Sequence, residues 1–434
     1  MKEEFLHYLW RYSAYESCAL RTCTGEPIQV VHPGQYNRIG AGPDFSNARI
    51  RIGDTLWIGQ VEIHLRSSDW RRHKHQYDEH YKNVILHVVY DHDEEVYLSR
   101  RGDLPVLELR SRIQPSMHSI YEQWLSDSTT DIVCGFRPKD IPEARWMAWR
   151  ERLRIEKMEE KINHVESIHQ QCNQNWLKTL FVCLSSGLGF SKNSMAMQQL
   201  ALSLPLSLLL KLKRDEFALS ALMFGQSGML EGNFTDPYPQ RLKAEYLFLK
   251  QKHQLEQPEG MLWQYGGVRP QNFPTIRIAQ LVNLVEHLEE LWSMLTRREK
   301  VFQFKKVLKI AANGYWKKHY KFDRESESFH SEILSETAVE LLITNVIAQV
   351  GFAYARYMNN HDLLDYSLNL SEVCKPEDNH MTRRWSSWGM RNANAADSQA
   401  LMRLLQHYCQ KKRCLECAIG HHILTKETND NSYS

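Results

Sequence analysis

The chain has 434 residues, of which 42% are hydrophobic and 24% are charged. This composition is typical of a globular protein and excludes a largely disordered one, and the length allows two or three domains with a substantial buried core. The formal net charge of +2 neither favours nor excludes nucleic acid as a partner, so only a local basic surface can make that case.

The sequence shows neither the pattern of a signal peptide nor that of a membrane-spanning segment. The N-terminal stretch MKEEFLHYLWRY starts with acidic residues and holds no apolar core of signal-peptide length. The longest apolar stretch, residues 200–212, contains Pro205 and is too short to cross a bilayer. We therefore predict a cytoplasmic protein with no membrane partner. Its nine cysteines are then expected to be reduced thiols or metal ligands, and no pattern indicates the oligomeric state.

The first ~110 residues alternate strand-like runs with turn signals. Residues 3–12 predict a short helix, and residues 27–33 predict a strand. Residues 45–52 and 55–65 predict an antiparallel hairpin with Gly53 and Asp54 as its turn. A polar surface helix is expected after Trp70, and VILHVVYDHD (84–93) predicts a buried strand. The order is therefore helix, three strands, helix, strand, in a sheet with antiparallel and parallel parts.

From about residue 142 onward the apolar residues recur at helical spacing. We predict an α+β protein in which a mixed-sheet domain is followed by a mostly α-helical region. The expected boundaries are an α/β domain at 1–113, a Pro-containing linker at 114–141, a helical domain with a C-terminal cysteine cluster at 142–424 and a disordered tail at 425–434.

The N-terminal order of elements carries a family resemblance. Pro43 and Asp44 precede one strand, and Glu62, Ile63 and His64 lie on the next, which resembles the core of the PD-(D/E)XK nucleases. In that family the acid pair binds one or two Mg²⁺ ions, and the third residue, usually Lys, steers or deprotonates the attacking water. The resemblance implies that Asp44, Glu62 and His64 are catalytic, that Asp44 and Glu62 hold Mg²⁺, and that Glu4 is a weaker candidate for the same site.

Strand geometry agrees with this chemistry. Side chains two apart on a strand share a face, so Glu62 and His64 point the same way, and an antiparallel neighbour can bring Asp44 within reach. Mg²⁺ prefers oxygen ligands and lowers the pKa of a bound water, whose proton an imidazole can accept. His64 departs from the family's lysine because a neutral imidazole carries no fixed charge. The structural alternative is that Asp44 caps a turn, Glu62 pairs with an arginine and His64 packs at the sheet edge.

Residues 67–93 are rich in histidine. Imidazoles at this density suit a zinc site, but no pair has helical i, i+4 spacing with a closing partner, so we favour contacts to substrate. The candidates are Ser67, Ser68, His73 and His75. The alternative is a solvated polar helix with Trp70 buried.

Three cysteines lie close together near the C-terminus. Cys409, Cys414 and Cys417 have C-x4-C-x2-C spacing, which resembles the start of plant-type ferredoxin ligation and is also compatible with zinc. We therefore expect zinc or an iron–sulfur cluster here, with a fourth ligand from His421, His422 or Cys374. Buried thiols on a helix are the alternative.

One stretch, residues 302–322, offers basic surface. Lys305, Lys317 and Lys318 are interleaved with Tyr315 and Trp316, and such residues can neutralise phosphates and stack on unpaired bases. The alternative is an amphipathic helix with solvated lysines.

The whole chain also resembles a Bacteroidota family known as a domain of unknown function, through stretches such as GPDF, VEIHLRSSDW and RPQNFPTIRIAQL. Taken together, these features predict Mg²⁺-dependent hydrolysis of phosphodiester bonds in DNA or RNA. The competing hypothesis is a non-catalytic module that binds nucleic acid or protein through a degenerate nuclease fold.

Overall fold

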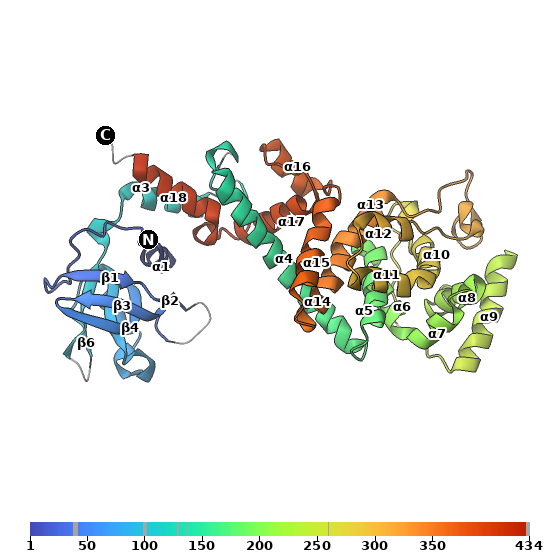
Figure 1. Cartoon of the computed structure of the whole chain (residues 1–434), viewed down its shortest axis with the longest axis horizontal. Helices are drawn as coiled ribbons and strands as arrows, with labels where there is room; N and C mark the ends of the chain where they lie inside the picture. Colours follow the sequence, from blue (N-terminus) through green and yellow to red (C-terminus); the bar gives the residue numbers. More distant parts are fainter. Residues whose placement is uncertain (38–41, 99–101, 128–129, 137, 259, 431–434) are drawn as a thin grey trace. The chain divides into compact units, whose positions relative to one another are not determined.

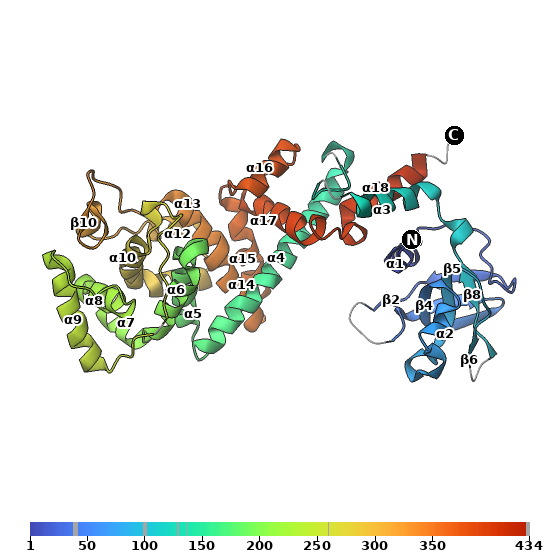
Figure 2. The ribbon, with the colours of Figure 1, turned by 180° about the vertical axis from the view of Figure 1, so that it is seen from behind.

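The computed structural model describes residues 1–37, 42–98, 102–127, 130–136, 138–258 and 260–430. Its contacts divide the chain into two compact units, shown in Figures 1 and 2. The N-terminal unit is Met1–Trp146 with Leu404–Ser434, and the helical unit is Met147–Arg403. The predicted α+β class, with a mixed sheet followed by a helical region, is confirmed.

A curled mixed sheet forms the centre of the N-terminal unit (Figure 1). Its strand order is β1-β3-β4-β5-β8, and β2 pairs with β3. The pairs β1/β3 and β3/β4 are antiparallel, whereas β4/β5 and β5/β8 are parallel. The strands are β1 (Ile28–His32), β2 (Gln35–Tyr36), β3 (Phe45–Ile52), β4 (Thr55–Arg66), β5 (Val84–Asp91) and β8 (Val106–Glu108), and a separate hairpin joins β6 (Tyr97–Leu98) to β7 (Gly102–Asp103).

The predicted hairpin is present between β3 and β4. Ile52 pairs with Thr55, which leaves Gly53 and Asp54 as the turn, and Gly53 has a φ of 56° that favours glycine. The buried run of β5 lies between two parallel neighbours and is covered on both faces, as its apolar sequence predicts.

Helix α1 (Glu3–Tyr12) packs against β4 and buries Phe5, Leu6, Leu9 and Trp10 completely. The single polar helix predicted after Trp70 is wrong. Its place is taken by the short helix α2 (Asp69–Arg72) and two 3₁₀ turns, His75–Tyr77 and Glu79–Tyr81. The helix breaks because the backbone of Lys74 adopts the left-handed conformation (φ 62°). The Asp78 carboxylate then accepts the N–H of His80, which begins the second 3₁₀ turn.

The predicted linker at 114–141 also differs from the structure. Helix α3 (Pro115–Ser126) lies within it and buries Met117, Tyr121 and Trp124. Helix α18 (Ala418–Asp430) lies beside α3 in Figures 1 and 2. Because Cys414 and Leu424 are buried in the same core as α3, the C-terminal segment belongs to the N-terminal unit and not to a helical domain that ends at 424. Residues 425–430 of the expected tail are helical, and 431–434 lie outside the described residues.

The helical unit surrounds an extensive apolar core that includes Leu180, Phe181, Leu222 and Leu284, all fully buried. A small hairpin, β9 (His319–Lys321) with β10 (Arg324–Glu325), belongs to it. Its helices are α4 (Glu143–Gln171, which begins in the N-terminal unit), α5 (Trp176–Leu188), α6 (Phe190–Ser203), α7 (Leu206–Leu212), α8 (Glu216–Gln226), α9 (Pro237–His253), α10 (Pro274–Leu284), α11 (Leu288–Thr296), α12 (Val301–Val307), α13 (Glu336–Leu342), α14 (Ala348–Tyr357), α15 (His361–Val373), α16 (His380–Ser387) and α17 (Ala395–Arg403).

Two apolar segments bear on the membrane prediction. The continuous helix Glu336–Tyr357, formed by α13, a π-helical turn and α14, is long and apolar enough to span a bilayer, but 78% of its most apolar window is buried inside the fold. A core helix of a soluble protein passes the same test, so this is weak evidence for a span. Residues 200–212, singled out from the sequence, fall on α6 and α7, which bend by 85° around Pro205.

A glycine on β4 provides a test of the sheet. A Cβ on Gly59 would lie 2.6 Å from the carbonyl oxygen of Asn83 and would clash with Ile85. We expect Gly59→Ala to destabilise the N-terminal unit by about 1–3 kcal/mol, as overpacking does. Hydrogen exchange at the β4 and β5 amides would measure the loss.

Gly266→Ala is the matched control, because a Cβ at Gly266 meets no atom within 4 Å. It should change stability by less than about 0.5 kcal/mol. Equal protection of β4 in wild type and Gly59→Ala would contradict the close β4/β5 contact.

Candidate metal centre

The three residues predicted from the nuclease resemblance converge on one part of the sheet. The backbone N–H of Asp44 donates to Glu62 Oε2 at 3.1 Å, and the N–H of Ile63 donates to Asp44 Oδ2 at 2.9 Å. His64 Nε2 lies 3.4 Å from Glu62 Oε1. Strand β4 therefore presents Glu62 and His64 on the same face, with Asp44 beside them at the start of β3.

His64 is buried among other histidines and has little contact with solvent. Its side chain is 2% exposed. Its Nδ1 lies 2.9 Å from Nε2 of His87 on β5, and its Nε2 lies 3.2 Å from Nδ1 of His73. Both ring nitrogens thus face other histidines, so His87 can hold one of them while the other remains directed at the cluster, as a metal ligand requires.

A group of three imidazoles forms around His64. His64, His73 and His75 each place one ring nitrogen within 4.8 Å of the others, and among the described residues this is the one group of three metal-ligating side chains found so close together. Glu62 Oε1 lies 3.4 Å from Nε2 of His75 as well as from His64. Two ligand atoms about 2.0–2.1 Å from a tetrahedral metal are about 3.3 Å apart, so the two distances from Glu62 fit a cation that Glu62 shares with His64 or His75.

The donor chemistry favours a transition metal over Mg²⁺. Imidazole nitrogen suits zinc, iron, copper or nickel, whereas Mg²⁺ prefers oxygen ligands. His75 Nε2 is buried and has no hydrogen-bond partner in the described structure, although Glu62 Oε1 is within ion-pair distance. A buried nitrogen in this position is one that a metal would satisfy.

Burial sets the protonation of the cluster. Burial, and then the nearby charge of Asp44, raises the pKa of Glu62 to about 9. Burial, followed by the neighbouring histidines, lowers the pKa of His64 to about 2 and that of His87 to about 3. Burial and His73 lower the pKa of His75 to about 4. His64, His75 and His87 are therefore neutral at pH 7, which is the form that binds metals.

An aromatic wall holds the rings in place. Tyr81 stacks on His75 with ring centroids 3.8 Å apart, and Trp70 contacts both His75 and His87 at 5.3 Å. His73 is the exposed member of the group. The cluster is consequently shielded by aromatic rings on one side and open to solvent at His73.

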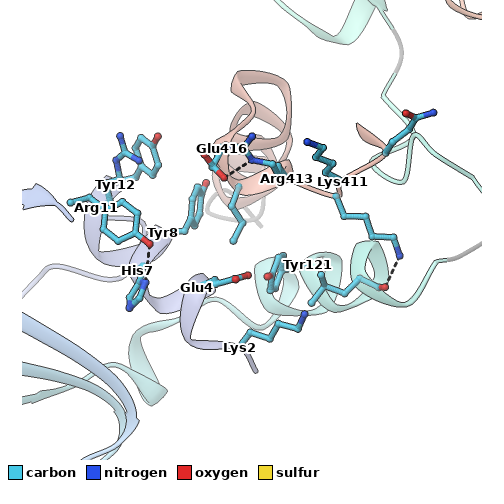
Figure 3. A pocket seen from close by; sticks show the side chains of 15 residues that line it. Lys2, Glu4, His7, Tyr8, Arg11, Tyr12, Tyr121, Lys411, Arg413 and Glu416 are labelled. Atoms are coloured by element: carbon cyan, nitrogen blue, oxygen red, sulfur yellow. Dashed lines mark hydrogen bonds and ion pairs between the residues drawn. The ribbon is translucent and has the colours of Figure 1, made fainter. Parts of the chain in front are cut away.

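Several site residues were missed in the sequence. His7 Nε2 on α1 lies 3.3 Å from Asp44 Oδ2, and its Nδ1 lies 3.2 Å from the hydroxyl of Tyr36. Glu3 Oε1 lies 3.8 Å from His7 Nε2, so Glu3 is the α1 carboxylate nearer to Asp44, whereas Glu4 lines a neighbouring cleft (Figure 3). The i, i+4 spacing of Glu3 and His7 on a predicted helix was the available signal.

Ser67 and Ser68 have a structural role in the described structure, and their contact to substrate stays a prediction. The Ser67 hydroxyl is fully buried and donates to the Glu94 carbonyl at 2.6 Å, and the Ser68 hydroxyl donates to Asp93 Oδ2 at 2.7 Å. Both serines thus stabilise the turn after β5. Of the four residues predicted to contact substrate, His73 and His75 belong to the histidine group.

The basic stretch of the helical unit does not present the expected surface. Lys305 pairs with Glu340, Lys317 lies 3.5 Å from Glu332, and Lys318 lies 2.8 Å from Glu325. Trp316 is fully buried, and the Tyr315 hydroxyl donates to Asp236 at 2.7 Å. The lysines are neutralised in pairs and the aromatic rings are not free to stack on bases.

The C-terminal cysteines pack in the N-terminal unit. Burial raises the pKa of the Cys414 thiol, and nearby Cys134 and Cys417 add to the shift. Cys409, Cys414 and Cys417 do not form a group of three close metal ligands in the described part of the chain. The proposed fourth ligands have other contacts, because His421 bonds to Tyr8, His422 to Asp140 and Cys374 to Leu370. The zinc or iron–sulfur site stays a prediction that this geometry does not support.

The metal centre predicts a specific loss of affinity. His73→Ala removes an exposed ligand without disturbing the core, so we expect Zn²⁺ or Co²⁺ to bind about 100-fold more weakly or worse. A competition titration with a chromophoric chelator would measure this on the full-length chain.

His80→Ala is the control, because His80 is an exposed histidine of the same segment that contacts Asp78 instead of the cluster. It should leave the affinity unchanged. Equal affinities for His73→Ala and wild type would contradict the assignment of His73 as a ligand.

Comparison with known proteins assigns most of the chain to a family but identifies no activity. No curated protein and no solved structure matches it. A family model described as "Protein of unknown function (DUF2851)" matches residues 3–380, which include the sheet, the histidine group and most of the helical unit. The chain therefore belongs to this family, DUF2851.

Proposed function

We propose that the N-terminal unit is a transition-metal-dependent hydrolase that cleaves phosphodiester bonds of DNA or RNA. The observation that carries this proposal is the group formed by His64, His73 and His75, with Glu62 Oε1 3.4 Å from two of these histidines and bonded to the backbone of Asp44 through its other oxygen. A carboxylate and imidazoles around a solvent-open position are a common donor set for hydrolytic metals.

The pairing of the strands supports the nuclease-like part of the proposal. Helix α1 is followed by β1, β3 and β4 in antiparallel order, and β5 then joins β4 in parallel. This is the sequence of elements that prompted the resemblance to the PD-(D/E)XK core. Asp44 and Glu62 fall on adjacent strands, where that resemblance places the acid pair.

Each polar group has a distinct part in this proposal. A bound divalent metal would lower the pKa of a coordinated water and stabilise charge that develops on the phosphate. Glu62, His64, His73 and His75 hold the metal, so His64 acts as a ligand in place of the water-steering role expected from the sequence. Asp44 uses Oδ2 to accept the N–H of Ile63. Its Oδ1 has no hydrogen-bond partner among the described residues and is available to orient and deprotonate the attacking water.

A second candidate is a non-catalytic binding module that the metal only stabilises. Glu62 and His64 are both buried, and four protein donors around one metal are typical of closed structural sites. This alternative predicts metal-dependent stability without turnover.

Hydrolysis of a small substrate separates the two functions. The full-length chain, stripped with a chelator and reloaded with Zn²⁺, Mn²⁺, Co²⁺ or Mg²⁺, should hydrolyse bis(p-nitrophenyl) phosphate faster with a transition metal than with Mg²⁺. Binding of metal without turnover for any ion would contradict the hydrolase and support the module.

Asp44→Asn tests the catalytic carboxylate. We expect turnover to fall by about 100-fold or more, because general-base catalysis contributes roughly 10²–10⁴, while the metal content measured by elemental analysis stays the same. Asp54→Asn, in the exposed hairpin turn, is the matched control and should keep full turnover. Loss of metal from Asp44→Asn would instead make Asp44 a ligand.

A further inference from the structure

A cleft of about 550 Å³ opens within the N-terminal unit (Figure 3). Its walls come from α1, from α3, from Tyr36 on β2 and from the segment 410–416. Residues at opposite ends of the sequence thus form one concave surface. The volume is in the range that holds a small ligand or a short stretch of a flexible chain.

The cleft is basic although the whole chain is nearly neutral. Five cationic side chains line it against two carboxylates, Glu4 and Glu416. Arg413 is neutralised by Glu416, with bonds of 2.6 and 2.8 Å, and Lys412 donates to two carbonyl oxygens at the end of α3. In the part of the chain that the structure describes, no carboxylate pairs with Lys2, Arg11 or Lys411. These three charges are available to an anionic ligand.

Aromatic rings accompany the free charges. Tyr12 is 42% exposed, and the guanidinium of Arg11 lies 5.3 Å from its ring centroid and 5.7 Å from that of Tyr36. His421 also packs on Tyr12, with ring centroids 4.6 Å apart. A cationic groove with an exposed tyrosine is the arrangement that binds phosphates and stacks on unpaired bases.

The cleft borders the metal centre through one residue. His7 lines the cleft, and its Nε2 lies 3.3 Å from Asp44 Oδ2. Tyr36, another lining residue, holds the other ring nitrogen of His7. A chain of phosphates with one group at Asp44 can therefore continue along α1 into the cleft.

We propose that this cleft binds an unpaired nucleic-acid strand next to the bond that is cleaved, with Lys2, Arg11 and Lys411 on phosphates and Tyr12 on a base. The inference rests on the proposed hydrolase and narrows its substrate to single strands. A duplex does not fit, because the cleft holds only about 550 Å³, which is the size of a site for a small ligand.

Binding without catalysis tests the cleft. Fluorescence anisotropy with the metal-loaded full-length chain carrying Asp44→Asn, which keeps the metal but should not cleave, would compare labelled DNA and RNA strands of about 12 nucleotides, within the size of known single-strand sites, with the matching duplexes. We expect single strands to bind at least tenfold more tightly than duplexes. The DNA and RNA arms show which sugar the cleft accepts.

Two variants locate the contact. Lys411→Ala should reduce the slope of log affinity against log salt by about 0.7, the value for one phosphate contact on a single strand. Tyr12→Ala should weaken binding about fivefold or more through lost stacking. Lys426→Ala and Tyr97→Ala, exposed residues of the same unit outside the cleft, are the matched controls and should bind like wild type.

The outcomes separate this inference from the hydrolase. Wild-type affinity in both cleft variants, or equal affinity for duplex and single strand, overturns the cleft as a strand site even if bis(p-nitrophenyl) phosphate is hydrolysed. Strand binding that depends on Lys411 and Tyr12 supports the cleft even if no metal gives turnover, in which case the hydrolase alone fails.

Discussion

A carboxyl group buried in the middle of β4 is the constraint on which the N-terminal unit depends. Glu62 is enclosed by His64, His75 and the backbone of Asp44, and burial favours its neutral form. Neutral imidazoles do not supply the positive charge that a buried carboxylate needs. The divalent cation that we propose would supply it and would also satisfy the unpaired ring nitrogen of His75. The arrangement is consistent with a metal as an integral part of this fold.

The parts of the site that follow from strand periodicity could be predicted from the sequence. Alternation on β4 places Glu62 and His64 on one face, and the two-residue turn at Gly53 brings β3 alongside. These relations are local, since each depends on residues within about 20 positions. The buried β5 was predictable for the same reason, because its apolar run has the length and composition of a covered strand.

The ligands supplied by irregular backbone could not be predicted in this way. His73 and His75 reach His64 because the left-handed Lys74 turns the chain between them, and no periodic pattern signals that turn. His7 approaches Asp44 only after α1 has packed on β4. The membership of the C-terminal segment in the N-terminal unit is likewise a long-range packing result, expressed in the burial of Leu424 with Trp124. Sequence spacing alone carries no information about such contacts.

Counting basic residues along the chain does not show which charges stay unpaired, for the same physical reason. The lysines of residues 302–322 are close in sequence, but glutamates from other segments pair with Lys305, Lys317 and Lys318. The basic cleft instead combines Lys2 with Lys411, which are 409 positions apart. The local field depends on which charges remain unpaired after folding, and not on their density in the sequence. A net charge of +2 is therefore compatible with a basic cleft.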